Sequence, residues 1–262
     1  MIFKCYEILF FKGKAFNHLD LFASMKSYHV GTSGWMFKEW KGIFYPNDVP
    51  QKNWFLYYTS IFSSVEINAS YYRWPSASVI KKWEENAPKD FVYTMKIPQI
   101  ITHIKRLQNV TEDIKSFYKT TSGLKEHLGC HLFQLPPSFR NDEKNLSRVE
   151  AVLKAMHGEN AFEFRHDSWW TTEVQKLFKE HNVAFASVIG RDIPESLIVT
   201  SDVVYVRLHG VEYATSYSKE DLADLASKLK SLKKKKVYAY FNNDVKAYSP
   251  QNAMVLKELL KA

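Results

Sequence analysis

The hydrophobic positions of this chain follow two periods that alternate along its length. Short apolar runs that end in turn or polar residues are typical of strands. Between them, apolar residues recur every three or four positions, as on one face of a helix, for example over residues 51–62, 143–156 and 218–232. The predicted strands are residues 28–33, 65–67, 91–97, 130–135, 161–164, 183–189, 203–208 and 236–241. This alternation predicts an α/β fold in which crossover helices join parallel strands.

Two architectures suit eight strands and seven or eight helices: a single (β/α)8 barrel of the TIM type and an open doubly wound sheet. An open sheet of this size usually carries a glycine-rich phosphate turn after its first strand, and Gly31-Thr-Ser-Gly34 lacks that spacing. The 262 residues also match the roughly 250 that such a barrel needs. We therefore predict a barrel domain over residues 25–262. Residues 190–201, too short for a good helix, form its weakest unit.

Residues 1–24 are predicted to be an N-terminal extension of the barrel. Met25 lies just before the first predicted strand and is an alternative start, in which case residues 1–24 would not be part of the native protein. The apolar stretches of the extension are too short to span a membrane, and no signal-peptide cleavage site follows them. We expect no membrane association.

The composition narrows the class of protein. With 45% hydrophobic and 15% aromatic residues the chain is expected to fold. Its only cysteines, Cys5 and Cys130, provide neither a disulfide framework nor a zinc-type CxxC spacing, which fits a cytoplasmic protein. The net charge of +8 admits a phosphorylated small molecule or a nucleic acid as partner. Part of that charge is the lysine run at 233–236, which is more typical of a solvated turn.

Polar and charged residues follow the predicted strands where each of them ends. In a barrel the carboxyl ends of all the strands meet on one face, which is where active sites of such folds lie. Burying so many ionisable groups would cost several kcal/mol unless they were paired or functional. For any one residue a paired surface charge explains the pattern equally well, but the whole set favours a functional site. The set comprises Ser33, Trp35, Glu66, Asn68, Lys96, Gln134, Glu163, Arg165, His166, Arg207, His209, Asn242, Asn243 and Asp244, with His103 from a nearby loop.

Six aromatic residues also lie at or just after strand ends: Trp35, Tyr71, Tyr72, Trp74, Trp169 and Trp170. They could be ordinary core residues. They could also wall a pocket and stack on a ring or a base of a ligand.

Chemical roles follow from the side-chain types. The candidate catalytic residues are Glu66, Lys96, Glu163, His166 and His209. The candidate substrate-binding residues are Trp35, Asn68, Tyr72, His103, Gln134, Arg165, Trp169, Arg207, Asn242 and Asn243, with the two arginines on phosphate oxygens. Oxygen and imidazole ligands for Mn²⁺, Zn²⁺ or Mg²⁺ could come from Glu66, Glu163, His209 and Asp244, although no local spacing supports a metal.

Several of these residues lie in motifs that resemble a known family. Gly31-Thr-Ser-Gly-Trp35, Val65-Glu-Ile-Asn68, Phe162-Glu-Phe-Arg-His166, Tyr205-Val-Arg-Leu-His-Gly210 and Tyr240-Phe-Asn-Asn-Asp244 resemble, in order, motifs of the YecE-like family, domain of unknown function 72. The resemblance covers about residues 28–260 and implies a TIM-type barrel with its signature residues at one mouth. It implies no particular reaction. One departure is Lys246-Ala247-Tyr248, where the family would have a small turn containing glycine.

Three hypotheses about function remain open. The first is a hydrolase or lyase that acts on a phosphorylated substrate, including nucleic acid, with a divalent metal. The second is a metal-independent isomerase or aldolase-like enzyme for a sugar phosphate, with Glu163 as base, a histidine as acid and Lys96 as electrophile or Schiff-base amine. The third is a non-catalytic nucleic-acid-binding protein.

Overall fold

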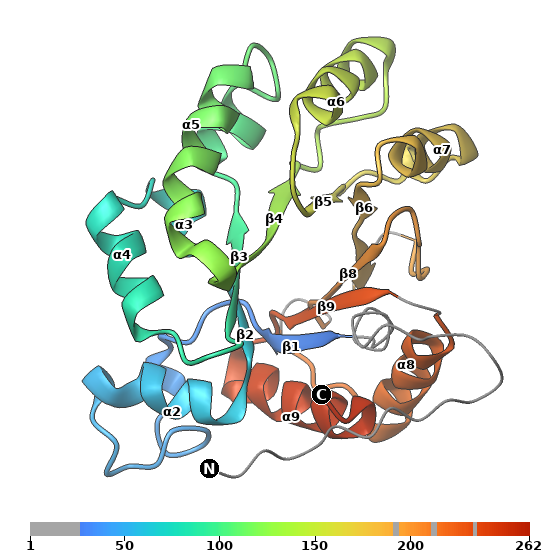
Figure 1. Ribbon diagram of the computed structural model, residues 1–262. Helices are drawn as coiled ribbons and strands as arrows, with labels where there is room; N and C mark the ends of the chain where they lie inside the picture. Colours follow the sequence, from blue (N-terminus) through green and yellow to red (C-terminus); the bar gives the residue numbers. More distant parts are fainter. Residues whose placement is uncertain (1–26, 191–193, 211–213, 233–234) are drawn as a thin grey trace, which may run out of the picture.

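The structure is a computed structural model that describes residues 27–190, 194–210, 214–232 and 235–262. The predicted extension over residues 1–24 lies outside the described residues. Figure 1 shows the strands at the centre of the molecule with helices arranged around them. The observed fold is therefore a mixed α/β fold, as the alternating pattern predicts.

The described strands form two parallel sheets. The strands are β1 Tyr28–Thr32, β2 Ser64–Ile67, β3 Val92–Lys96, β4 Leu128–Gln134, β5 Asn160–Glu163, β6 Ala184–Phe185, β7 Ser187–Ile189, β8 Val203–Leu208 and β9 Lys236–Phe241. One sheet has the order β1-β9-β8-β7 and the other β2-β3-β4-β5-β6. Neighbours in both sheets are mostly consecutive in sequence, which is the outcome of repeated strand–helix–strand units.

The sixth predicted strand, 183–189, is interrupted at Ala186 and belongs to both sheets. Its first part, β6, pairs with β5, and its second part, β7, pairs with β8. At the break the Ala186 backbone N–H still donates to the Phe162 carbonyl at 2.8 Å. The continuous ladder of a closed barrel is therefore not observed here, because one apolar run is shared between two sheets.

The sheets also meet at β1 and β2, where a tyrosine hydroxyl replaces ladder hydrogen bonds. Tyr58 OH accepts from the Thr32 backbone N–H at 3.0 Å and donates to the Ser64 carbonyl at 3.0 Å. A Cβ atom on Gly31 would lie 2.1 Å from the Ser64 carbonyl oxygen, so only glycine permits this approach of the two strands. Tyr58 is fully buried and thus links the two sheets.

The main helices lie on the outside of the sheets (Figure 1). They are α2 Trp54–Ile61, α3 Ala69–Tyr72, α4 Ala77–Asn86, α5 Thr111–Thr121, α6 Glu143–Ala155, α7 Thr172–Glu180, α8 Lys219–Ser231 and α9 Tyr248–Leu260. Single turns occur at Lys38–Trp40, Gln51–Asn53, Ile100–Ile104, Ser122–His127, Asp167–Trp169 and Val245–Ala247. Helix α8 begins with a complete capping box in which the side chains of Ser218 and Asp221 each accept a bond from the other residue's backbone.

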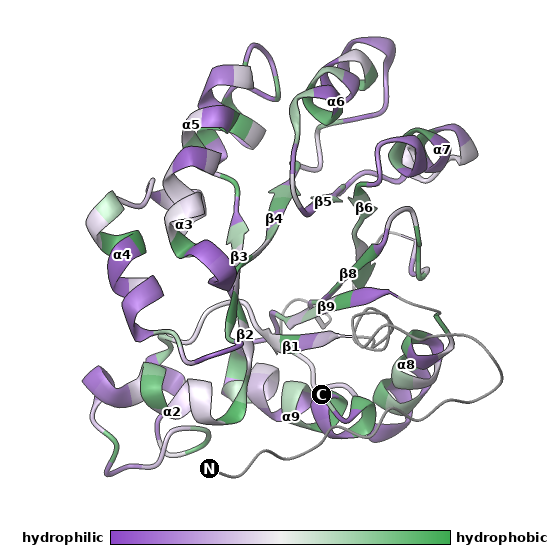
Figure 2. Ribbon diagram, viewed as in Figure 1, coloured by the Kyte–Doolittle hydropathy of each residue, from purple (hydrophilic) through white to green (hydrophobic). Residues whose placement is uncertain are grey.

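The hydrophobic core has an inner and an outer layer. The inner cluster draws side chains from both sheets, so the sheets face one another across it; its members are Cys130, Leu132, Ala161, Ala184, Ala186, Val203, Tyr205, Tyr238 and Tyr240. The outer, larger layer includes buried helix residues such as Ile80, Phe117 and Leu256. Figure 2 shows the corresponding pattern, with largely hydrophobic strands and helices of mixed hydropathy. This arrangement leaves the strand ends to carry polar groups.

The turn after β9 keeps a glycine-like backbone without glycine. Lys246 and Ala247 have φ angles of 54° and 55°, in the left-handed region that favours glycine. For residues with a Cβ atom this conformation costs roughly 1–2 kcal/mol each. The departure from the family motif therefore changes the side chains of this turn but leaves it in a left-handed conformation.

Candidate active site

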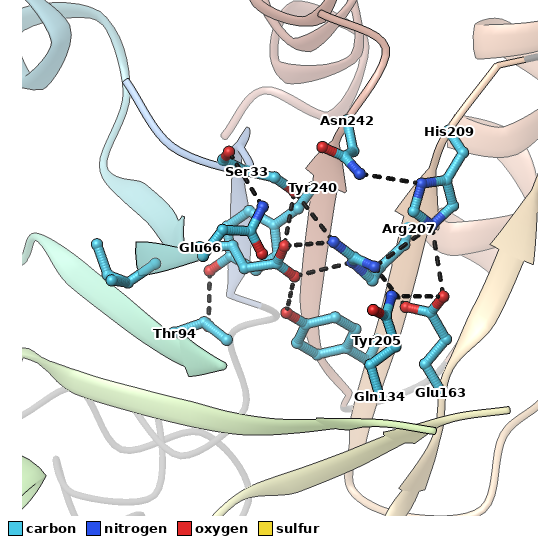
Figure 3. Close-up of polar contacts among 12 residues, drawn as sticks. Ser33, Glu66, Thr94, Gln134, Glu163, Tyr205, Arg207, His209, Tyr240 and Asn242 are labelled. Carbon is cyan, nitrogen blue, oxygen red and sulfur yellow. Dashed lines mark hydrogen bonds and ion pairs between the residues drawn. The ribbon is translucent and has the colours of Figure 1, made fainter. Parts of the chain in front are cut away.

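The guanidinium of Arg207, on β8, is the centre of a buried cluster of charged residues (Figure 3). It binds the Glu66 carboxylate with two hydrogen bonds, from Nη2 to Oε1 at 2.6 Å and from Nε to Oε2 at 3.0 Å. Its Nη1 donates to Glu163 Oε2 at 2.5 Å. All three side chains are fully buried. Arg207, on β8 of one sheet, therefore binds two carboxylates of the other sheet, Glu66 on β2 and Glu163 on β5.

Both oxygens of the Glu66 carboxylate accept hydrogen bonds from strong donors. Besides Arg207, Ser33 Oγ donates to Oε1 and Tyr205 OH donates to Oε2, both at 2.6 Å. Burial alone would raise the pKa of the Glu66 carboxyl, but the charge and hydrogen bonds of Arg207, with the two hydroxyl groups, hold it below its ordinary value. Glu66 is therefore ionised and firmly held at neutral pH.

Glu163 is bound in the same manner. It accepts hydrogen bonds from Arg165 and from Gln134 Nε2, the latter at 3.0 Å, in addition to Arg207. Burial opposes ionisation here as well, yet Arg165 and Arg207 hold the pKa of the Glu163 carboxyl well below its usual range. A carboxylate with such a low proton affinity is a weak general base, so the predicted role of Glu163 as base has little support in this environment.

The residues predicted to bind a divalent metal do not fit a metal centre. The oxygens of Glu66 and Glu163 already accept bonds from Arg207, whose positive charge lies where an ion would have to sit. Asp244 Oδ1 accepts a hydrogen bond from Ser249 Oγ at 2.7 Å, and burial raises the pKa of Asp244 to about 6. Within the described part of the chain, no three His, Cys, Asp or Glu side chains are placed to hold an ion.

His209 lies in the cluster as a neutral imidazole. Its Nδ1 is 3.2 Å from the Asn242 amide nitrogen, and its Nε2 is 3.5 Å from Glu163 Oε1. Burial, together with the charge of Arg207, lowers the pKa of His209 to about 4. The side chain is positioned as predicted, but it is not a ready source of an imidazolium proton at neutral pH.

Lys96, at the end of β3, is the cation of this region that no carboxylate contacts directly. It is 8% exposed, and its Nζ lies 4.3 Å from the centre of the Tyr71 ring. Within the described residues its ammonium group has no hydrogen bond or ion pair. Burial and the charge of Arg207 lower the pKa of Lys96 to about 8, against the opposite effect of Glu66 and Glu163. His103 contacts the same Tyr71 ring at 5.1 Å, and burial with Lys96 lowers its pKa to about 4.

Three cations and three carboxylates contribute charge to this region. Lys96, Arg165 and Arg207 are positive when protonated, Glu66 and Glu163 are negative, and Asp244, whose charge acts on both Arg207 and Glu66, is a third negative charge once the pH exceeds its pKa of about 6. The neutral histidines add nothing. The positive and negative charges therefore balance near neutral pH, and Lys96 is distinguished by its place beside an aromatic ring and not beside a carboxylate.

Some predicted site residues have structural surroundings instead. Trp169 is fully buried, donates from its indole N–H to the Phe139 carbonyl at 2.7 Å, and stacks on Phe164 at 4.1 Å, so it is a core residue. The Nδ1 of His166 accepts from the backbone of Ser168 at 3.2 Å and caps the turn Asp167–Trp169.

Two further candidates lie at the edges of the region. Asn243 is buried and donates to the Thr215 carbonyl at 2.8 Å and to Asn252 Oδ1 at 3.0 Å, which fixes the loop after β9. Tyr72 is 74% exposed and contacts Tyr71 edge-on at 4.9 Å. Asn68 and Trp35 border a pocket at the ends of β1 and β2.

Two residues of the cluster were not predicted from the sequence. Tyr205 bonds Glu66, and Tyr240 OH contacts Thr94 Oγ1 at 2.9 Å beneath it (Figure 3). The signal was present, because Tyr205 lies two positions before Arg207 on one strand and therefore points to the same face. It was missed because aromatic residues inside strands are usually core.

The sequence of this chain is similar to that of several proteins of one family. The family model described as Protein of unknown function DUF72 matches residues 29–262. The UPF0759 protein YunF of Bacillus subtilis is 26% identical over 268 residues, covering 88% of this chain and 94% of that protein. The UPF0759 protein YecE of Escherichia coli is 28% identical over 115 residues, covering 43% of this chain and 42% of that protein.

Solved structures give the same result. A DUF72 family protein from Thermotoga maritima has a TM-score of 0.83 and 31% identity, covering 90% of this chain and all (100%) of that chain. For a DUF72 family protein from Enterococcus faecalis the identity is 20% and the TM-score 0.76, over 90% of this chain and 96% of that chain, which supports the fold.

None of the helices in the described ranges is both long and apolar enough to cross a membrane. Because the family model spans most of the chain, the protein belongs to the YecE-like DUF72 family.

Proposed function

We propose that the protein is a metal-independent enzyme in which the Lys96 amine forms a Schiff base with the carbonyl group of an anionic, phosphorylated small molecule. The observation that carries the proposal is the buried Lys96 ammonium, which contacts an aromatic ring but no carboxylate. This choice favours the isomerase or aldolase-like lyase hypothesis over metal-dependent hydrolysis, since Arg207 occupies the carboxylates that a metal would need.

The chemistry requires a neutral amine in a dry environment. The lone pair of Nζ attacks the carbonyl carbon and forms a C–N bond, and the carbonyl oxygen takes one proton from the amine and one from solvent water and leaves as water, which gives an iminium ion. That ion accepts the electron pair of a C–H bond at the adjacent carbon, whose proton passes to water, or of a C–C bond there, whose cleavage turns a β-hydroxyl group into a carbonyl and releases the hydroxyl proton to water. Both steps leave an enamine, and its reprotonation and hydrolysis release the product and restore the amine. A lysine with a pKa of about 8 has a substantial neutral fraction at physiological pH.

Arg165 is the residue that we propose for the phosphate group. Its Nε binds Glu163, and its side chain is 12% exposed, so guanidinium hydrogens remain toward the mouth. Arg207 is fully buried between its two carboxylates and is proposed to position them rather than to contact the substrate.

We also infer that the two sheets act as one barrel. Side chains from both sheets share the inner core, Tyr58 links β1 to β2, and only Ala186 separates β6 from β7. In that arrangement the cluster lies at the carboxyl ends of the strands, where barrel enzymes bind their substrates.

The test is reductive trapping with glyceraldehyde 3-phosphate and, as a matched compound without phosphate, glyceraldehyde. The protein is incubated with each compound and sodium cyanoborohydride, and the modified lysines are mapped by peptide mass spectrometry. We expect Lys96 to be modified first and faster by the phosphorylated compound, with Arg165→Met removing that preference. The exposed Lys81 serves as an internal reference, since its side chain is 73% exposed.

Modification of Lys96 no faster than that of Lys81 would refute the Schiff-base role. The Lys96→Arg variant keeps the positive charge but cannot form the adduct, so it separates catalysis from anion binding. A non-catalytic nucleic-acid-binding protein predicts a different outcome, namely salt-sensitive binding of an oligonucleotide that Lys96→Arg leaves unchanged.

A further inference from the structure

A pocket of about 320 Å³ opens beside the Arg207 cluster, at the ends of β1 and β2. Its walls include Gly34, Trp35, Met36 and Trp83, and its polar lining residues are Ser33 and Asn68. Ser33 also donates to Glu66, so one residue borders both the pocket and the charged cluster. A mostly apolar cavity with a few fixed polar groups is the usual form of a small-molecule subsite.

Asn68, a lining residue of this pocket, has a hydrogen-bond acceptor that no group of the described residues uses. Its Nδ2 donates to the Ser33 carbonyl at 3.3 Å, which fixes the orientation of the amide. Its Oδ1 is buried and, within the described residues, has no hydrogen-bond partner. A buried acceptor without a donor is unfavourable, so such an atom beside a pocket gains from a donor that a ligand brings.

The pocket lies near Lys96 along the chain path, although Lys96 does not line it. Ile67, the last residue of β2, pairs with Met95 of β3, so Asn68 follows directly after β2 where the neighbouring strand β3 ends at Lys96. Adjacent strands are about 4.8 Å apart. Ser70 Oγ strengthens this junction, because it lies 2.9 Å from the Ile67 carbonyl and 2.6 Å from that of Lys96.

The entrance of the pocket is apolar and partly exposed. Met36 at its edge is 54% exposed, and Trp35, half-buried, lies 5.1 Å from the Phe55 ring. A second cavity of about 620 Å³ shares Trp35, Met36 and Trp83 with the first. Flat aromatic walls of this kind favour a planar ring over an aliphatic chain, because ring faces gain stacking energy in addition to burial.

We propose that this pocket binds the ring end of the substrate, a planar heteroaromatic group that donates an N–H hydrogen bond to Asn68 Oδ1. The inference rests on the proposed function for the anionic, carbonyl-bearing end at Lys96 and adds the chemical class of the other end. The substrate is then a phosphorylated carbonyl compound that carries a nitrogen heterocycle.

The experiment uses three uncharged probes that cannot form a Schiff base: benzimidazole, 1-methylbenzimidazole, which lacks the N–H donor, and 2-methylbenzimidazole, which has the same added methyl group but keeps the donor. Affinities are measured by ligand-detected NMR titration of the full chain. We expect benzimidazole and 2-methylbenzimidazole to bind about 2- to 10-fold more tightly than 1-methylbenzimidazole, the ratio that one net hydrogen bond gives.

Variants locate the binding in this pocket. Asn68→Leu is expected to remove the preference for probes with an N–H donor. Met36→Arg, at the exposed entrance, is expected to lower the affinity of all three probes. Met36→Arg does not disturb the core and keeps the test valid if Asn68→Leu folds poorly. Equal affinity of the three probes for the native protein, no binding at all, or a preference that survives Asn68→Leu would overturn the proposal.

Lys96→Met separates this proposal from the proposed function. The variant cannot form the Schiff base, but it is expected to bind the probes with unchanged affinity, because none of them needs the amine. Failure of the trapping experiment with intact probe discrimination would refute the function and leave the ring subsite, whereas the reverse result would refute only the ring subsite.

Discussion

Replacing Arg207 by Met should invert the pH dependence of stability. In the native protein Arg207 lowers the folded-state pKa of Glu66 and Glu163 below the ordinary value of 4.5. These carboxylates therefore stabilise the fold above about pH 4.5, and that stability is lost as the pH falls through their folded pKa values. In Arg207→Met, Glu163 keeps Arg165, but Glu66 keeps only the hydroxyl groups of Ser33 and Tyr205.

In the variant, burial dominates and raises the folded-state pKa of Glu66. The contribution of Glu66 to the free energy of unfolding is then present at low pH and is lost as the pH rises through that pKa. Breaking a buried ion pair costs about 3–5 kcal/mol, a large share of a total stability of about 5–15 kcal/mol. We expect Arg207→Met to lose about that amount near pH 7 and to regain part of it near pH 5.

The assay is denaturant unfolding followed by tryptophan fluorescence at about pH 5 and about pH 7.5. Arg140→Met removes the same charge from an exposed position and should change stability by no more than about 0.5 kcal/mol. Adding Glu66→Gln to Arg207→Met removes the titrating group and should abolish the inversion. A loss below about 1 kcal/mol, or a pH dependence parallel to that of the native protein, would refute the proposed charge arrangement.

Three other changes test separate parts of the structure. Tyr58→Phe should cost about 1–3 kcal/mol in denaturant unfolding, because the Thr32 N–H and the Ser64 carbonyl both lose a buried partner; a neutral result would mean that the sheets are joined otherwise. The rate of cyanoborohydride trapping at Lys96 should rise with pH and reach half its maximum near pH 8, whereas a midpoint near the value of about 10.4 that is usual for lysine would contradict the lowered pKa. Trp169→Ala should cost about 3–5 kcal/mol in unfolding free energy, as expected of a core aromatic residue, and should leave the Lys96 adduct of the folded protein unchanged; loss of the adduct without loss of stability would restore Trp169 to the site.

Two features follow from the amino-acid sequence alone: the alternation of strands and helices, and the gathering of five polar residues at one face, Glu66, Lys96, Glu163, Arg207 and His209. Hydrophobic periodicity marks where each strand ends, and parallel strands present their carboxyl ends to one face. The family motifs occupy the same strand ends. Both results depend on local sequence patterns, which can be recognised before any contact between distant residues is known.

The surroundings of each of these groups depend on contacts that form only in the folded chain. Arg207 and Glu66 are 141 positions apart, and no local spacing shows that one guanidinium binds two carboxylates and that Lys96 has no carboxylate partner among the described residues. The break at Ala186 and the Tyr58 link between the sheets are likewise contacts between distant segments. Hydrogen-bond partners and desolvation depend on which distant groups meet, and these two effects set the ionisation and hence the chemistry of each side chain.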